Sequence, residues 1–104
     1  MYENNDIDEV IDLEIYAKES KDIPFGRKVR YRVKIDDKYY IIDHREPTGR
    51  ELLRIANMNP PEGYRLDQKL RGGATKKIEL DEKVDLAQPG IERFITIPLD
   101  TTEG

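Results

Sequence analysis

Residues 28–52 read KVRYRVKIDDKYYIIDHREPTGREL, and this run contains two strand patterns, a turn and the start of a helix. Between Lys28 and Ile35, apolar and basic side chains alternate with the period of two that is typical of a strand with one buried face. Asp36-Asp37 then provides turn residues, and the β-rich segment 39–43 follows. The two segments are therefore predicted to pair as a hairpin.

A capping box predicts that a helix begins at Thr48. The threonine precedes Glu51 by three residues, so its hydroxyl oxygen can accept a hydrogen bond from an early helical amide. The glutamate carboxylate can in turn accept one from the amide of the cap. The helix is predicted to end before Asn59-Pro60-Pro61, because proline cannot continue the hydrogen-bond ladder.

Three further strand patterns follow the helix, at residues 64–70, 76–80 and 91–98. This order of elements predicts an α+β fold of the β-grasp (ubiquitin-like) type, a mixed sheet of four to five strands wrapped on one helix. The facing of the last strand stays open. Either Phe94 and Thr96 point into the core, or Ile95 and Ile97 do.

The composition limits the class of protein. The 104 residues, with 37% hydrophobic and 38% charged side chains, suit one domain with a modest core. No apolar run approaches the roughly 20 residues that cross a bilayer, and the N-terminus is acidic where a signal peptide is basic. Zero cysteines and one histidine, His44, exclude a thiolate site and a multi-histidine site. We expect a cytoplasmic protein without cofactor, metal or membrane contact, and not an enzyme.

Acidic residues are concentrated at the N-terminus. Residues 1–22 hold eight acidic and two basic side chains, a net charge of −6 in a chain whose total is −4. This segment repels itself and ends in the helix-breaking Ile23-Pro24-Phe25-Gly26. We therefore predict a flexible acidic arm (1–26), a folded domain (27–98) that begins near Arg27, and a flexible tail (99–104).

Part of the arm, DEVIDLE at residues 8–14, is similar to a SUMO-interacting motif, an apolar core flanked by acids. Such a motif adds a strand beside the second strand of a SUMO-like domain. It predicts docking of the arm on the folded domain, in the same copy or, by self-association, on a neighbouring one. The residues concerned are Val10, Ile11 and Leu13 in the arm, and Arg30, Arg32 and Lys34 on a basic face. A merely solubilising arm and a short amphipathic helix are the alternatives.

The tetrapeptide Leu70-Arg71-Gly72-Gly73 copies the tail of ubiquitin but lies inside the predicted domain. Cleavage after Gly73 would remove two strands, so we interpret these residues as a hairpin turn whose glycines provide positive φ. A single RGG in an acidic chain also lacks the charge needed for nucleic acid binding.

Three segments together resemble the bacterial multiubiquitin-type ubiquitin-like proteins. They are YRVKIDDKYY (31–40), TGRELL (48–53) and PGIERF (89–94), within a similarity that covers about residues 28–98. The resemblance implies a protein modifier encoded beside an activating enzyme, a conjugating enzyme and a metalloprotease-type deconjugase. Such sets are associated with bacterial conjugation and antiviral defence pathways.

The resemblance also implies a conjugation site at Gly104. An activating enzyme would adenylate its carboxylate, hold it as a thioester and pass it to a lysine or hydroxyl of a target protein. Glycine suits this chemistry because a residue without Cβ can thread a narrow channel. Thr101, Thr102 and Glu103 would form the tail that the enzymes engage. Ubiquitin-like tails commonly end Gly-Gly, and the Glu103-Gly104 ending departs from that pattern.

Two other functions remain open at this point. One is a β-grasp binding or assembly module that is never conjugated and acts through the acidic arm. The other is a sulfur carrier with a C-terminal thiocarboxylate.

Overall fold

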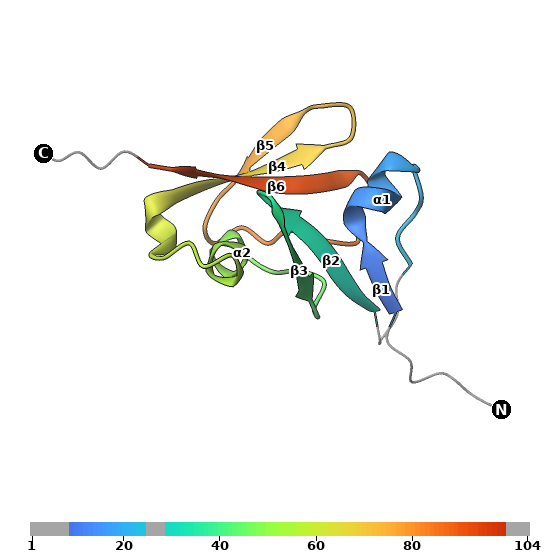
Figure 1. Cartoon of the computed structure of the whole chain (residues 1–104), viewed down its shortest axis with the longest axis horizontal. Helices are drawn as coiled ribbons and strands as arrows, with labels where there is room; N and C mark the ends of the chain where they lie inside the picture. The colour runs from blue at the N-terminus through green and yellow to red at the C-terminus, as the bar shows by residue number, and fades with distance from the viewer. Residues whose placement is uncertain (1–8, 25–28, 100–104) are drawn as a thin grey trace, which may run out of the picture.

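A computed structural model of the chain describes residues 9–24 and 29–99 (Figure 1). The described residues form a six-stranded mixed sheet, two α-helices and one short 3₁₀ helix. In chain order these are β1 (Glu9–Asp12), α1 (Leu13–Lys18), β2 (Val29–Ile35), β3 (Lys38–Ile42), α2 (Gly49–Ile55), η1 (Pro61–Gly63), β4 (Tyr64–Leu70), β5 (Thr75–Ile78) and β6 (Ile91–Pro98).

The sheet has β2 and β6 at its centre. The strand order is β1-β2-β6-β4-β5, with β3 paired to β2. β2 is antiparallel to β3 and parallel to β6, while β4 is antiparallel to both β5 and β6. A mixed sheet of β2 to β6 with one main helix, α2, confirms the predicted α+β fold of the β-grasp type.

Helix α2 begins where the capping box predicted it. The Thr48 hydroxyl accepts from the amide of Glu51 at 3.2 Å, and the Glu51 carboxylate accepts from the amide of Thr48 at 3.0 Å. Leu52 and Leu53 are buried. Gly49 opens the helix against the β5 end of the sheet, where an added Cβ would lie 2.4 Å from the carbonyl oxygen of Glu79. The capping box therefore fixes where α2 starts, and Leu52 and Leu53 pack α2 against the core.

The last strand turns one face to the core. Phe94 in the middle of β6 is fully buried, whereas Ile97 is 41% exposed. Thr96 shares the inward register of Phe94, and its hydroxyl donates to the Asp36 carboxylate at 2.6 Å. Of the two facings left open by the sequence, the structure has the one with Phe94 inside.

The segment Leu70-Arg71-Gly72-Gly73 forms the turn between β4 and β5, as predicted. Gly72 and Gly73 have φ values of 94° and 99°, in the left-handed region that favours glycine. The amide of Gly73 donates to the carbonyl of Leu70 at 3.0 Å. The two strands joined by this turn pair in antiparallel register from Leu66 to Lys69.

The N-terminal segment belongs to the folded unit, whereas the sequence had placed the start of that unit near Arg27. β1 runs parallel to the first half of β2, with Ile11 opposite Tyr31. β6 pairs with β2 only at the C-terminal end of β2, where Ile35 is opposite Phe94. In Figure 1 the two strands diverge from that point, and β1 with α1 lies where they separate.

Apolar side chains of this segment fill the space between β2 and β6. Ile11 and Leu13 are fully buried, and Ala17 and Ile23 are also buried. α1 contacts both β2 and β6. An acidic segment was predicted to stay outside because its apolar residues are few, but those few are the ones that complete the core.

We expect Ile11→Ala to lower the free energy of unfolding by about 2 to 4 kcal/mol, because the side chain is fully buried and its loss leaves a cavity. Val10→Ala, on the neighbouring residue that is 44% exposed, should cost about 0.5 kcal/mol or less. Urea denaturation of both variants measures the difference. Equal, small effects would contradict the burial of β1 in the core.

Candidate functional site

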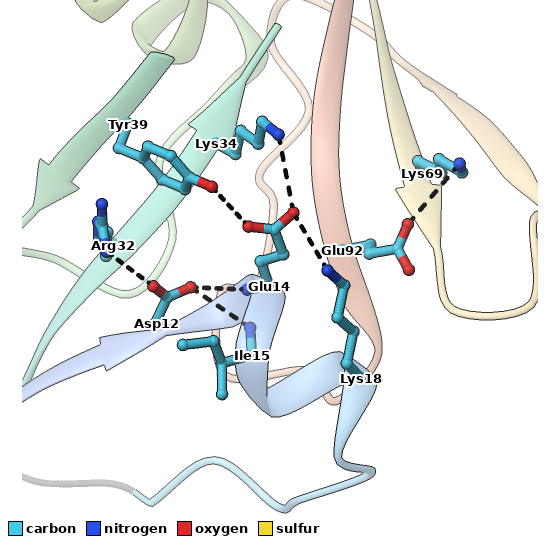
Figure 2. A network of polar contacts seen from close by, with 9 residues as sticks. All are labelled: Asp12, Glu14, Ile15, Lys18, Arg32, Lys34, Tyr39, Lys69 and Glu92. Atoms are coloured by element: carbon cyan, nitrogen blue, oxygen red, sulfur yellow. Dashed lines mark hydrogen bonds and ion pairs between the residues drawn. The ribbon is translucent and has the colours of Figure 1, made fainter. Parts of the chain in front are cut away.

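The contacts between the N-terminal segment and the outer face of β2 and β3 form a polar cluster (Figure 2). We call it the outer network. Its members are Asp12, Glu14, Arg32, Lys34 and Tyr39.

Asp12 has two roles in the outer network. One carboxylate oxygen, Oδ1, caps α1 by accepting from the amides of Glu14 at 3.1 Å and Ile15 at 3.4 Å. The other, Oδ2, accepts from Nη1 of Arg32 at 3.0 Å. Arg32 also lies over the ring of Tyr39, with its guanidinium carbon 4.0 Å from the ring centroid. A single aspartate therefore ends β1, starts α1 and pairs with β2.

Glu14, in the first turn of α1, links three elements. It accepts a hydrogen bond of 2.7 Å from the Tyr39 hydroxyl of β3. Its other oxygen lies 3.8 Å from the amines of Lys34 on β2 and Lys18 on α1. Figure 2 shows these three side chains converging on the carboxylate.

These contacts shift the ionisation of both partners. The Tyr39 hydroxyl, followed by the nearby cations Lys34, Lys18 and Arg93, holds the pKa of Glu14 below its ordinary value of 4.5, although partial burial acts in the opposite direction. The same hydrogen bond raises the pKa of Tyr39 above 10.0. The carboxylate is therefore ionised, and the phenol neutral, at neutral pH.

The structure places the three predicted docking residues of the arm in different environments. Ile11 and Leu13 are buried beneath the sheet, while Val10 is exposed. β1 lies beside β2, the first strand of the predicted domain, and not beside β3, the second strand. In a parallel pair Val10 is opposite Arg30, and Asp12 is opposite Arg32.

The predicted basic face is in contact with the acids of the N-terminal segment. Arg32 pairs with Asp12, and Lys34 lies near Glu14. Glu14 and Tyr39 were not among the predicted site residues, although Glu14 flanks the apolar core of the motif. Tyr39 lies near Glu14 because the pairing of β2 with β3 places it opposite Lys34, which also lies near Glu14. No local sequence pattern predicts that pairing.

The predicted tail residues Thr101, Thr102, Glu103 and Gly104 lie outside the described residues. β6 ends at Pro98, and the amide of Leu99 donates to the carbonyl of Gly63 at 2.8 Å. The side chain of Leu99 is 47% exposed. The last described residue is thus bound by its backbone to η1, with its side chain at the surface.

Within 9–24 and 29–99, no group of three or more His, Cys, Asp or Glu side chains could hold a metal ion. None of the helices in this part of the chain is long and apolar enough to span a membrane.

Comparison with known proteins identifies the family. The family model described as Multiubiquitin matches residues 31–98. The chain belongs to the multiubiquitin family. This ubiquitin-like family accounts for the sheet from β2 to β6 and for α2, whereas β1 and α1 precede the match. No curated protein and no solved structure is similar enough to count as a match.

The outer network therefore connects a segment that precedes the family match to the first hairpin of the multiubiquitin unit. Burial of Ile11 and Leu13 provides the apolar part of this attachment, and Asp12 and Glu14 provide the polar part. The pair of Asp12 with Arg32 also specifies the register, because shifting β1 by one residue would turn Asp12 towards the core.

We expect Glu14→Gln to lower the free energy of unfolding by about 0.5 to 1 kcal/mol at pH 7, since solvent screens these contacts. A carboxylate whose folded pKa lies below 4.5 stabilises the fold above that pH and loses this effect as pH falls through the lowered value. The gap between wild type and variant should therefore narrow as pH falls from 7 to below 4.5. Urea denaturation across this pH range measures it.

Glu92→Gln is the matched control. Glu92 is similarly exposed and lies 3.7 Å from Lys69, but within residues 9–24 and 29–99 no tyrosine donates a hydrogen bond to its carboxylate as Tyr39 does to Glu14. We expect it to cost less than about 0.5 kcal/mol. A Glu14→Gln gap that is constant from neutral to acidic pH would contradict the role assigned to the Glu14 carboxylate.

Proposed function

We propose that the protein is a ubiquitin-like modifier that is activated at Gly104 and transferred to target proteins. Its partners in this proposal are an activating enzyme, a conjugating enzyme and a metalloprotease-type deconjugase of a bacterial conjugation pathway, with a role in antiviral defence. The pathway would operate in the cytoplasm. The protein itself is the transferred group in this scheme and not a catalyst.

The observation that most supports this proposal is how the ubiquitin-like unit ends. The last backbone hydrogen bond of the described chain is that of Leu99 with Gly63. The sequence continues after β6 with Asp100 to Gly104. Measured from the end of β6 at Pro98, the six residues Leu99 to Gly104 reach about 20 Å when extended. This is enough to bring the glycine into an active site while the folded unit stays outside.

The proposed reaction has three steps. A carboxylate oxygen of Gly104 attacks the α-phosphorus of ATP and releases pyrophosphate. A cysteine thiolate of the activating enzyme then displaces AMP, and the thioester passes to the conjugating enzyme by the same exchange. Finally an amine or hydroxyl of the target attacks the thioester carbonyl, the thiolate leaves, and the proton of the nucleophile goes to a base. The absence of Cβ at Gly104 allows close approach at each step.

The alternative is a binding module that is never conjugated and that acts through the N-terminal segment. It requires the apolar residues of the motif to be available to a partner. Ile11 and Leu13 are instead buried in the core of their own domain. For this reason we prefer the modifier.

We expect the protein, mixed with the activating and conjugating enzymes of its own organism, ATP and Mg²⁺, to form an adduct that a thiol reductant removes. Deletion of Gly104 should abolish this adduct, and Gly104→Ala should slow its formation by about tenfold or more, because a Cβ obstructs the approach of the carboxylate. Non-reducing gel electrophoresis and intact-mass measurement detect it.

Lys83→Ala is the control. Lys83 is exposed and lies before β6, outside the tail, so this variant should react as the wild type does. If no adduct forms with active enzymes, or if removal of Gly104 leaves its yield unchanged, the non-conjugated module becomes the better interpretation.

A further inference from the structure

A cavity of about 370 Å³ opens at the end of the molecule where β6 begins. Its wall comes from the residues around the end of α1, from the end of β4, and from the loop 88–90. It therefore lies between the N-terminal segment and the ubiquitin-like unit. The amide of Arg71 donates to the carbonyl of Gly90 at 2.8 Å, which ties two parts of the wall together.

The charged residues that line this cavity are Lys21 and Arg71, and both are cations. Arg71 forms no ion pair within residues 9–24 and 29–99. The amine of Lys21 lies 3.1 Å from the Glu19 carboxylate and 5.0 Å from the centroid of the Tyr16 ring. Ala17, Leu70 and Pro89 add apolar surface. In a chain of net charge −4, a partly apolar cavity with two cations favours an acidic ligand.

An acidic segment of suitable size follows β6. Leu99 to Gly104 reads LDTTEG, with carboxylates at Asp100 and Glu103 and an exposed apolar side chain at Leu99. We propose that the cavity binds this segment from a second copy of the chain, with Asp100 and Glu103 near Arg71 and Lys21.

The segment Leu99 to Gly104 is too short to reach the cavity of its own chain. The cavity adjoins Gly90, just before β6, whereas the segment starts after Pro98, where β6 ends. A strand of this length spans about 26 Å. From Pro98, the six residues Leu99 to Gly104 extend about 20 Å, which is less than the length of β6, so they cannot return to the cavity of their own chain.

Cavity and segment are different surfaces, so each copy can bind one neighbour at either end. Such head-to-tail contacts do not close on themselves unless a rotation brings the ends together, and they produce open chains of copies. The binding is non-covalent and needs neither ATP nor an enzyme. Its test is therefore independent of the test of the proposed conjugation. Because it relies on exposed charges, salt should weaken it.

Charge exchange in the full-length protein tests this contact. At about 20 mM salt, sedimentation equilibrium of the wild type should give a mass that rises with concentration above 12.2 kDa. At about 500 mM salt the mass should return to that of one chain. Lys21→Glu/Arg71→Glu, and separately Asp100→Lys/Glu103→Lys, should weaken association by about tenfold or more.

Combining all four substitutions in one chain should restore association, because the charges of both partners are reversed while the net charge equals that of the wild type. Lys38→Glu/Lys83→Glu is the matched control for the cavity variant. It changes the net charge equally at two exposed lysines outside the cavity and should associate more strongly than the cavity variant.

A synthetic LDTTEG peptide, titrated into the isotope-labelled protein, gives a second test. The amides of Ala17, Arg71 and Gly90 should shift and those of β3 should not. The proposal is overturned if the wild type stays monomeric at low salt, if the cavity variant associates as the wild type does, if the four-substitution variant does not recover, or if the peptide shifts amides elsewhere. If the cavity variant fails to fold, the association of the tail variant, Asp100→Lys/Glu103→Lys, tests the proposal by itself, and association equal to that of the wild type would overturn it.

Discussion

The structure depends on filling the space that opens where β2 and β6 diverge. The two central strands pair only through Ile35 and Phe94, so the first half of β2 would otherwise have an unpaired edge and an uncovered apolar face. β1 pairs with that edge, and Ile11 and Leu13 cover the face. The N-terminal segment is thus part of the fold, although the match to the multiubiquitin family begins after it.

Electrostatics determines how this segment is oriented. The outer face of β2 carries basic side chains, and β1 brings Asp12 and α1 brings Glu14 against them. Tyr39 of β3 adds a hydrogen bond to Glu14 across the width of β2. Because a parallel strand shifted by one residue would turn Asp12 towards the core, the apolar contacts and the charged contact of β1 select the same register. The two ends of the molecule then differ in character, with cations beside the start of β6 and an acidic sequence after its end.

Several elements were predictable because their signals are local. The alternation in β2, the capping box of α2 and the glycines after β4 each specify a backbone conformation within a few residues. The family resemblance rested on the same segments, and the match over residues 31–98 confirmed it. The outer network was predictable only in part, because Arg32 and Lys34 were identified as a basic face while Glu14 and Tyr39 meet through strand pairing.

The sequence by itself determined the order of elements, the hairpin, the start of the main helix and the ubiquitin-like class, since these follow from periodicity and capping within short windows. Tertiary structure decided where the N-terminal segment goes. Its few apolar residues among many acids show no periodicity long enough to predict burial. Whether Ile11 is solvated or fully buried depends on a space bounded by β6, about eighty residues further along the chain.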